Sequence, residues 1–139
     1  DLVIGGTGDD KVAGGPGADS VYAGPGADQL GGGTGDDVLF GQVGDDRLQG
    51  GAGADQLYGG LGNDRVEGGP GDDLLTAGGD PTVLDAGSGD DTVLARSGAR
   101  DEIDCGPGRD TVRADAVDVL HGCEISAGSP RSLRRARAR

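Results

Sequence analysis

Aspartate recurs at every ninth position along most of this 139-residue chain. The series is interrupted only by Thr82 and comprises Asp1, Asp10, Asp19, Asp28, Asp37, Asp46, Asp55, Asp64, Asp73 and Asp91. Carboxylates are hard oxygen ligands, and carboxylates stacked without cations repel one another strongly. An Asp-Gly turn without metal explains one such residue, but it does not explain a whole series in register. The spacing therefore indicates a row of cation sites.

The overall charge agrees with this interpretation. The chain carries a net charge of -13 and 32 glycines, and its only aromatic residues are Tyr22, Phe40 and Tyr58. So little apolar bulk fits either a disordered acidic segment or a fold organised by something other than a large core. An acidic body repels nucleic acid and anionic membranes, and no apolar run reaches the length of a membrane span. We expect cations as partners, with no nucleic acid and no membrane span.

The elements that must position the aspartates repeat with the same period. Nine-residue blocks such as GGTGDDKVA, GGPGADSVY and GGAGADQLY follow one another without slip from Gly5 to Leu94. When the blocks are aligned, each of the nine positions forms a column: the fourth column is almost always Gly and the eighth is always Val or Leu. Glycine permits a tight turn over the first six residues of a block, and the last three alternate as a short half-buried strand. Such units are stable only when they stack as a coil.

These columns resemble the pattern of the RTX (repeats-in-toxin) family, G-G-x-G-x-D followed by a variable, an aliphatic and a variable residue. The resemblance covers residues 1–94 closely and CGPGRDTVR at 105–113 well. The ending CGPGRDTVR…CE is also similar to that of secreted calcium-binding repeat proteins of actinobacterial type. The family implies an all-β fold. Specifically, it implies a right-handed parallel β-roll (a β-solenoid) with two short-stranded sheets and calcium-binding turns on both edges.

The resemblance also implies several Ca²⁺ ions as cofactors, each lying between turns 18 residues apart and held by aspartates and glycine carbonyls. One edge would pair Asp10, Asp28, Asp46 and Asp64, and the other would run from Asp1 to Asp91. The turn glycines concerned are Gly6, Gly8, Gly15, Gly17, Gly24, Gly26, Gly33, Gly35, Gly44, Gly51, Gly53, Gly60, Gly62, Gly69, Gly71 and Gly89. The first row should weaken where GGDPT lacks the usual Gly and Asp, with Asp80 as a substitute ligand. We expect a chain that is largely disordered in chelator and β-rich in millimolar calcium.

Alternation along the short strands predicts an apolar outer face that contains Ile4, Tyr22, Phe40 and Tyr58. Two explanations remain open. The stacked rings stabilise neighbouring strands, or they form a packing surface for a second copy, an upstream domain or the C-terminal segment.

The register breaks after Leu94. The segment ARSGARDEID has ten residues, and counting places Arg100 where the metal-binding aspartate belongs. Cys105 and Cys123 indicate a disulfide formed in an oxidising compartment, with two free thiols as the alternative. We therefore expect β-roll repeats over 1–94, degenerate last coils with a disulfide-pinned cap over 95–125, and a basic disordered tail over 126–139.

No catalytic motif of the H-E-x-x-H, G-x-S-x-G or P-loop type is present, and His121 is the only histidine. The predicted function is a secreted, extracellular calcium-binding module with a structural or interaction role and no enzymatic activity. The alternative is a C-terminal stabilising or secretion-linked domain of a larger protease or lipase, or an adhesin. An ice-binding role is disfavoured because the outer rows lack a regular Thr ladder. The start at Asp1 without Met suggests a fragment or a processed form.

Overall fold

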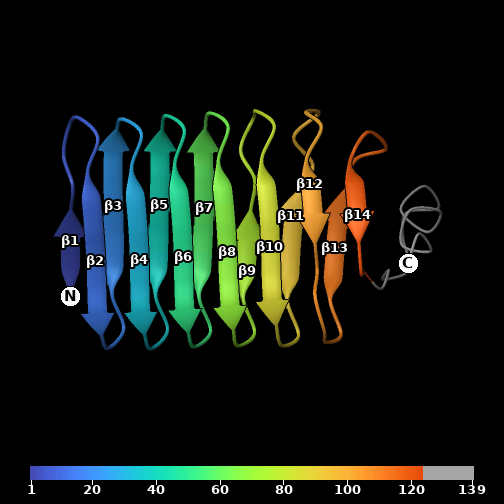
Figure 1. Ribbon diagram of the computed structural model, residues 1–139, viewed down its shortest axis with the longest axis horizontal. Helices are drawn as coiled ribbons and strands as arrows, with labels where there is room; N and C mark the ends of the chain where they lie inside the picture. The colour runs from blue at the N-terminus through green and yellow to red at the C-terminus, as the bar shows by residue number, and fades with distance from the viewer. Residues whose placement is uncertain (124–139) are drawn as a thin grey trace.

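Two seven-stranded parallel sheets lie face to face in the computed structural model, which describes residues 1–123 (Figure 1). The odd-strand sheet contains β1 (Leu2–Ile4), β3 (Ser20–Pro25), β5 (Val38–Val43), β7 (Gln56–Leu61), β9 (Leu74–Thr76), β11 (Thr92–Ala95) and β13 (Thr111–Ala114). The even-strand sheet contains β2 (Lys11–Pro16), β4 (Gln29–Thr34), β6 (Arg47–Ala52), β8 (Arg65–Pro70), β10 (Val83–Ser88), β12 (Glu102–Asp104) and β14 (Val119–His121). The chain passes from one sheet to the other at every turn, so the predicted parallel β-roll is confirmed.

The core consists mainly of the eighth-column aliphatic side chains of the two facing sheets. Leu39 pairs in register with Val21 on one side and Leu57 on the other, so the eighth column stacks upon itself every 18 residues. These residues are fully buried, as are Leu48 and Leu84 of the opposite sheet. Alternation along each strand therefore turns one column of the repeat into a continuous interior.

The strands are longer than the repeat pattern predicted. We expected six-residue turns and three-residue strands, but β2 and most of its neighbours run for six residues. Pairing continues through the second-column glycines, as in Gly15 with Gly33, although both have positive φ. Because the same bend recurs in every coil, successive backbones stay parallel and the hydrogen-bond ladder between them continues through the bend. Glycine suits this column, because a Cβ on Gly24 would lie 2.0 Å from the carbonyl oxygen of Gly6, and Gln42 is an exception with φ of 79°.

The coil continues beyond the regular repeats, through β12, β13 and β14. Glu102 pairs with Val83, which places Asp101 opposite Thr82 and leaves Arg100 exposed in the turn. The placement of Arg100 in the aspartate column was therefore wrong, and Asp101 occupies that position. The reason is that Ile103 must face the core, where it is fully buried, so the turn accommodates the extra residue.

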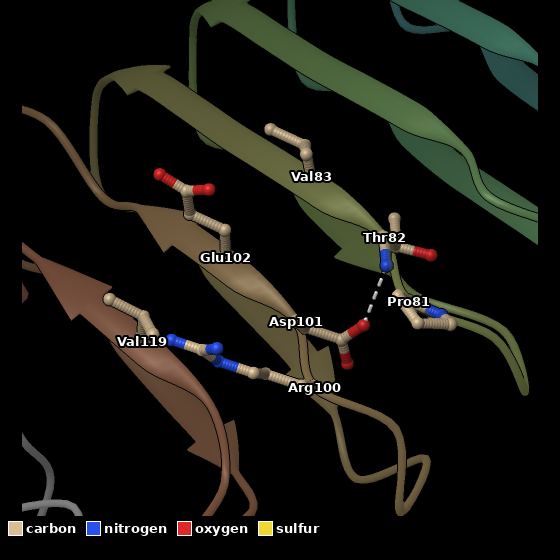
Figure 2. Close-up of a pocket in the computed structure, with 7 residues that line it drawn as sticks. All are labelled: Pro81, Thr82, Val83, Arg100, Asp101, Glu102 and Val119. Atoms are coloured by element: carbon tan, nitrogen blue, oxygen red, sulfur yellow. Dashed lines mark hydrogen bonds between the residues drawn. The ribbon is translucent and has the colours of Figure 1, made fainter.

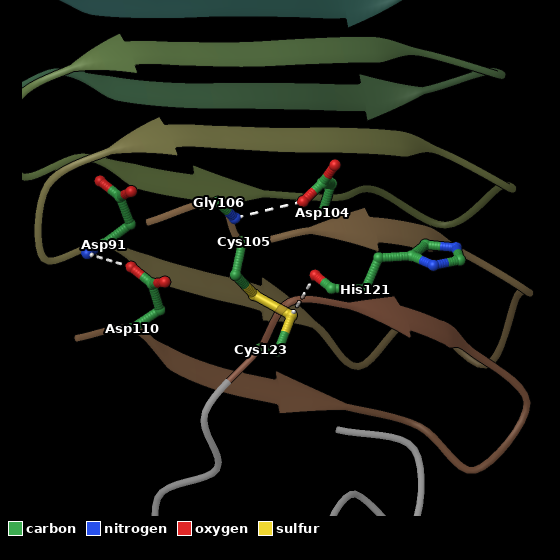
Figure 3. Close-up of a disulfide and its surroundings, with 7 residues drawn as sticks. All are labelled: Asp91, Asp104, Cys105, Gly106, Asp110, His121 and Cys123. Atoms are coloured by element: carbon green, nitrogen blue, oxygen red, sulfur yellow. Dashed lines mark hydrogen bonds between the residues drawn. A yellow bond between two sulfur atoms is a disulfide. The ribbon is translucent and has the colours of Figure 1, made fainter. Parts of the chain in front are cut away.

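The predicted disulfide between Cys105 and Cys123 is confirmed, with a Cα–Cα distance of 5.0 Å (Figure 3). Both cysteines are buried, and the Cys105 N–H donates to the His121 carbonyl at 3.0 Å. The bond therefore joins the last two strands of the even-strand sheet at the end of the core. The predicted basic tail over 126–139, and the last two residues of the predicted cap, lie outside the described residues.

Within residues 1–123, no helix has the length and apolar character needed to cross a membrane.

Candidate metal sites in the turns

The sixth-column aspartates connect consecutive coils through one carboxylate oxygen. The backbone N–H of Asp19 donates to Oδ1 of Asp37 at 2.8 Å, and the N–H of Asp28 donates to Oδ1 of Asp46 at 2.9 Å. The same contact recurs along both edges of the roll. The Asp19 edge carries Asp19, Asp37, Asp55, Asp73, Asp91 and Asp110, and the Asp10 edge carries Asp10, Asp28, Asp46, Asp64, Thr82, Asp101 and Asp118. The structure thus brings the predicted aspartates together in the two rows expected.

The second carboxylate oxygen, Oδ2, is buried and has no hydrogen-bond partner in Asp10, Asp19, Asp28, Asp37, Asp46, Asp55, Asp64, Asp73 and Asp91. Eight of these side chains are at most 3% exposed, all except Asp10. A buried polar atom without a partner costs about 1–3 kcal/mol, and more when it is charged. The same buried, unpartnered oxygen in turn after turn fits a ligand that is not part of the chain. A cation would satisfy it and neutralise the row.

First-column glycines keep space free beside these oxygens. A Cβ on Gly41, Gly50 or Gly59 would lie 2.6 Å from Oδ2 of Asp46, Asp55 or Asp64, respectively. Ala23 and Ala86 fill this column in the turns of Asp28 and Asp91. The first column was not among the predicted site residues, although its small side chains were visible in the repeat. All the predicted turn glycines, from Gly6 to Gly89, lie in the second and fourth columns and have positive φ.

The rows are electrostatically unfavourable without a cation. Burial, above all, raises the pKa of Asp64 and of Asp91 to about 6 and that of Asp73 to about 7, and neighbouring carboxylates add to the effect. Burial likewise raises the pKa of Asp37, Asp46 and Asp55. A carboxylate in this environment accepts either a proton or a metal ion. The donor set, carboxylates with backbone carbonyls nearby, fits a hard cation.

Side chains alone do not complete a site. Among residues 1–123, no group of three or more His, Cys, Asp or Glu side chains is arranged to hold a metal ion. Each ion would therefore need backbone oxygens of the turns in addition to carboxylates, which is the ligand type that the glycine-rich sequence provides.

A second set of aspartates, in the fifth column, was missed by the sequence reasoning. Oδ1 of Asp45 accepts from the N–H of Asn63 at 2.9 Å, and Oδ1 of Asp72 accepts from the N–H of Asp90 at 2.8 Å. The same contact joins Asp9 to Ala27, Asp36 to Ala54 and Asp90 to Arg109. These exposed carboxylates connect each turn to the next without a cation. The Asp-Asp doublets of the repeat were the signal that could have revealed them.

The Asp10 edge changes at Thr82. In the regular turns the fourth-column N–H donates to a backbone carbonyl of the next coil, as the N–H of Gly44 does to Leu61. At the break the N–H of Gly62 donates instead to a side chain, Oδ2 of Asp80, at 2.9 Å. Beside this break lies a hollow of about 350 Å³ lined by Pro81, Thr82, Val83, Arg100, Asp101, Glu102 and Val119 (Figure 2). In Figure 2 the side chain of Arg100 extends toward Val119, whereas the carboxylate of Asp101 turns toward Thr82.

Comparison with known protein families agrees with the geometry. The model of the RTX calcium-binding nonapeptide repeat, which spans four copies, matches residues 1–30, 31–66, 58–93, 67–102 and 76–112. These matches together extend over most of the chain and include both rows of aspartates except Asp118. No curated protein matches the sequence.

Proposed function

We propose that this chain, which belongs to the RTX calcium-binding nonapeptide-repeat family, folds on binding several Ca²⁺ ions and acts as a structural and interaction module outside the cell. The observation that carries this proposal is the repeated, buried and unpartnered Oδ2 atom of the sixth-column aspartates. The aspartates are the proposed side-chain ligands, and the turn glycines contribute carbonyl oxygens.

Calcium suits these turns for chemical reasons. It takes six to eight oxygen ligands in flexible geometry, whereas Mg²⁺ requires a stricter octahedral arrangement and loses its water reluctantly. Two stacked turns can surround an ion with carboxylate and carbonyl oxygens, and the absent Cβ of residues such as Gly50 leaves the space. A hard divalent cation also keeps buried carboxylates such as Asp73 ionised.

Folding should depend on the ions, because the core is narrow. Each block contributes one large aliphatic side chain to the interior, and most blocks also bury one carboxylate. The burial of so little apolar surface does not offset the conformational entropy of ordering a glycine-rich chain. Binding free energy therefore becomes folding free energy.

The test compares the far-UV circular dichroism of the intact chain in EGTA, in millimolar Ca²⁺ and in millimolar Mg²⁺. We expect a disordered spectrum in EGTA, a β-rich spectrum in Ca²⁺ and little change in Mg²⁺. A β-rich spectrum that persists in EGTA at neutral pH would contradict the proposal.

The disulfide and the family together indicate a location outside the cytoplasm. We propose a secreted, extracellular protein, since calcium there is abundant enough to fill such sites. The family match concerns the repeat alone, so the actinobacterial type remains a hypothesis based on CGPGRDTVR…CE.

The only domain identified is a repeat domain of a kind that is typically not catalytic. His121, the only histidine of the sequence, is half exposed, and its Nε2 lies 3.7 Å from Oε1 of Glu102. Catalysis by a parent protease or lipase would therefore lie in another domain, and the roll would act as its C-terminal stabilising or secretion-linked part. An adhesin would use the roll as a spacer. The sequence of the complete gene distinguishes these roles.

A partner surface is the second part of the proposal. Tyr22, Phe40 and Tyr58 stack in adjacent strands, with ring centroids 4.8 Å apart. The same three strands end in Pro25, Val43 and Leu61, which are mutually in register, and the latter two are 51% and 57% exposed. We call the three stacked rings the apolar patch. Because the rings cover one another's faces and present their edges, the patch suits a flat protein surface better than a sugar ring.

We propose a second copy of the chain as the occupant. The patch bears no charge in a protein of net charge -13, so two copies could meet there without opposing carboxylates. Tyr22→Ser with Phe40→Ser should abolish self-association in calcium, measured by sedimentation equilibrium. Ala13→Ser with Gln49→Ser, in the same column of the opposite sheet, serves as the control. Oligomeric state that is unchanged in the first variant, or a wild-type protein that stays monomeric, would refute this role.

A further inference from the structure

The two edges of the roll end differently. Along the Asp19 edge, every turn from Asp19 to Asp91 carries a carboxylate whose Oδ2 has no partner. Along the Asp10 edge, the last three turns carry Thr82, Asp101 and Asp118, and none of these contributes an unpartnered Oδ2. All three residues are buried to at least 99%, so the difference does not come from exposure to solvent.

Asp101 receives a donor from its own turn. Its Oδ1 accepts the N–H of Thr82 at 2.8 Å, as the repeat requires, but its Oδ2 accepts the hydroxyl of Ser97 at 3.1 Å. The Ser97 hydroxyl oxygen in turn accepts the N–H of Ala99 at 3.0 Å, which fixes its position. The extra residue of this turn therefore brings a side chain to the oxygen that is unpartnered elsewhere.

Asp118 is satisfied by a backbone group. Its Oδ1 accepts the N–H of Asp101 at 2.9 Å, and its Oδ2 accepts the N–H of Asp115 at 2.6 Å. The N–H of Asp118 donates back to the carbonyl of Asp115 at 3.2 Å. The short turn over 115–118 thus closes on Oδ2, and the carboxylate has a partner at both of its oxygens.

Thr82 offers no carboxylate opposite Asp64, and its hydroxyl donates to the carbonyl of Asp80 at 3.1 Å. The first column of these three blocks is Ala77, Ala95 and Ala114. Ala also fills the first column in the turns of Asp28 and Asp91, so this column does not distinguish the three turns.

We propose that the row of calcium ions on the Asp10 edge ends at Asp64, and that the Ser97 hydroxyl and the Asp115 amide replace the ion at Asp101 and Asp118. The row on the Asp19 edge continues further along the roll. The last coils therefore close one of their two edges without calcium. This inference rests on the proposed function, because it assigns the ends of rows whose calcium occupancy is itself proposed.

The experiment counts bound Ca²⁺ by native mass spectrometry of the intact chain, with circular dichroism in saturating calcium to verify that each variant folds. Asp46→Asn, within the row, should lose bound calcium. Asp101→Asn should bind the same number of ions as the wild type. Thr82→Asp should bind more, because it places a carboxylate opposite Asp64, whereas Thr82→Val should not.

Ser97→Ala supplies an independent readout. It should leave the number of bound ions unchanged and lower the melting temperature in saturating calcium, since Asp101 loses its donor. Loss of calcium from Asp101→Asn equal to that from Asp46→Asn would overturn the inference while leaving the proposed function intact. A wild-type chain that binds no calcium would instead refute the proposed function.

Discussion

The N–H of Asp28 donates to Oδ1 of Asp46 at 2.9 Å, while Oδ2 of the same carboxylate is buried without a partner. One oxygen therefore sets the stacking of two coils, and the other is left for a cation. Because the two oxygens have different roles, substitutions that affect calcium binding can be distinguished from those that affect the stacking of coils.

Asp46→Asn should raise the calcium concentration needed for half-maximal folding several-fold, because it removes a charged ligand from the row. The neighbouring Asp45→Asn is the matched control. Asp45 is exposed and accepts only the N–H of Asn63, so its loss should cost about 1 kcal/mol or less. Calcium titrations followed by circular dichroism measure both variants. Equal shifts would show that the two columns do not differ in function.

Gly50→Ala should weaken calcium-dependent folding, because the new Cβ would lie 2.6 Å from Oδ2 of Asp55 and 2.7 Å from the carbonyl oxygen of Gly68. Gly31→Ala is the control, since a Cβ there meets nothing within 4 Å and the backbone is not left-handed. The control should be neutral or stabilising by up to about 1 kcal/mol. If both variants titrate alike, the space beside Asp55 does not serve a ligand.

Gln42→Gly should stabilise the folded state by about 1 kcal/mol. Gln42 has φ of 79° and is the only residue other than glycine with positive φ within residues 1–123. Glycine adopts this conformation without the steric cost that a side chain incurs. Gln49→Gly, at a regular strand position of β6, should destabilise instead. Thermal unfolding in saturating calcium measures the pair, and a lower melting temperature for Gln42→Gly would contradict the assignment of strain.

Removing the disulfide by Cys105→Ala with Cys123→Ala should cost about 3 kcal/mol, given the sequence separation of 18 between the cysteines. The loss should be largest at the end of the roll, where the bond joins β12 to β14. Hydrogen exchange of the amides at position 105 and at Val119 should therefore accelerate more than that of Arg47 in β6. Uniform acceleration along the chain would show that the bond stabilises the whole roll rather than its end.

Low pH should partly replace calcium. The folded pKa values of Asp64, Asp73 and Asp91, about 6 to 7, exceed that of an unfolded aspartate near 3.9, so the folded chain binds more protons between these limits. Without calcium, the stability of the fold should therefore fall as pH rises through this window. Circular dichroism in calcium-depleted buffer should show more β structure at pH 5 than at pH 7.5. The opposite trend would contradict the burial of these carboxylates.

Much of the fold was predictable because the period was unbroken. In a coil of constant length, each column stacks on itself, so the register of Tyr22, Phe40 and Tyr58 followed from counting. Counting failed at Arg100, because a ten-residue block does not show which position accommodates the extra residue. The burial of Ile103 determines that.

The candidate site was predicted less completely. The spacing identified the sixth-column aspartates, but it did not show that their two oxygens do different things. It also did not distinguish Asp45, which binds a neighbouring amide, from Asp46. The role of Gly50 depends on the direction in which a Cβ at this position would point. That direction follows from the backbone conformation of the stacked coils and not from the sequence.

The stack of Tyr22, Phe40 and Tyr58 provides an intrinsic spectroscopic signal for the folding of the chain. Both tyrosines of the protein belong to it, and the sequence contains no tryptophan. Near-ultraviolet dichroism of tyrosine therefore originates from Tyr22 in β3 and Tyr58 in β7, and it should strengthen when the rings of these coils are fixed against Phe40. A spectroscopist can follow the ordering of these coils in the unmodified protein, without an added label, while the far-ultraviolet signal reports on the whole chain.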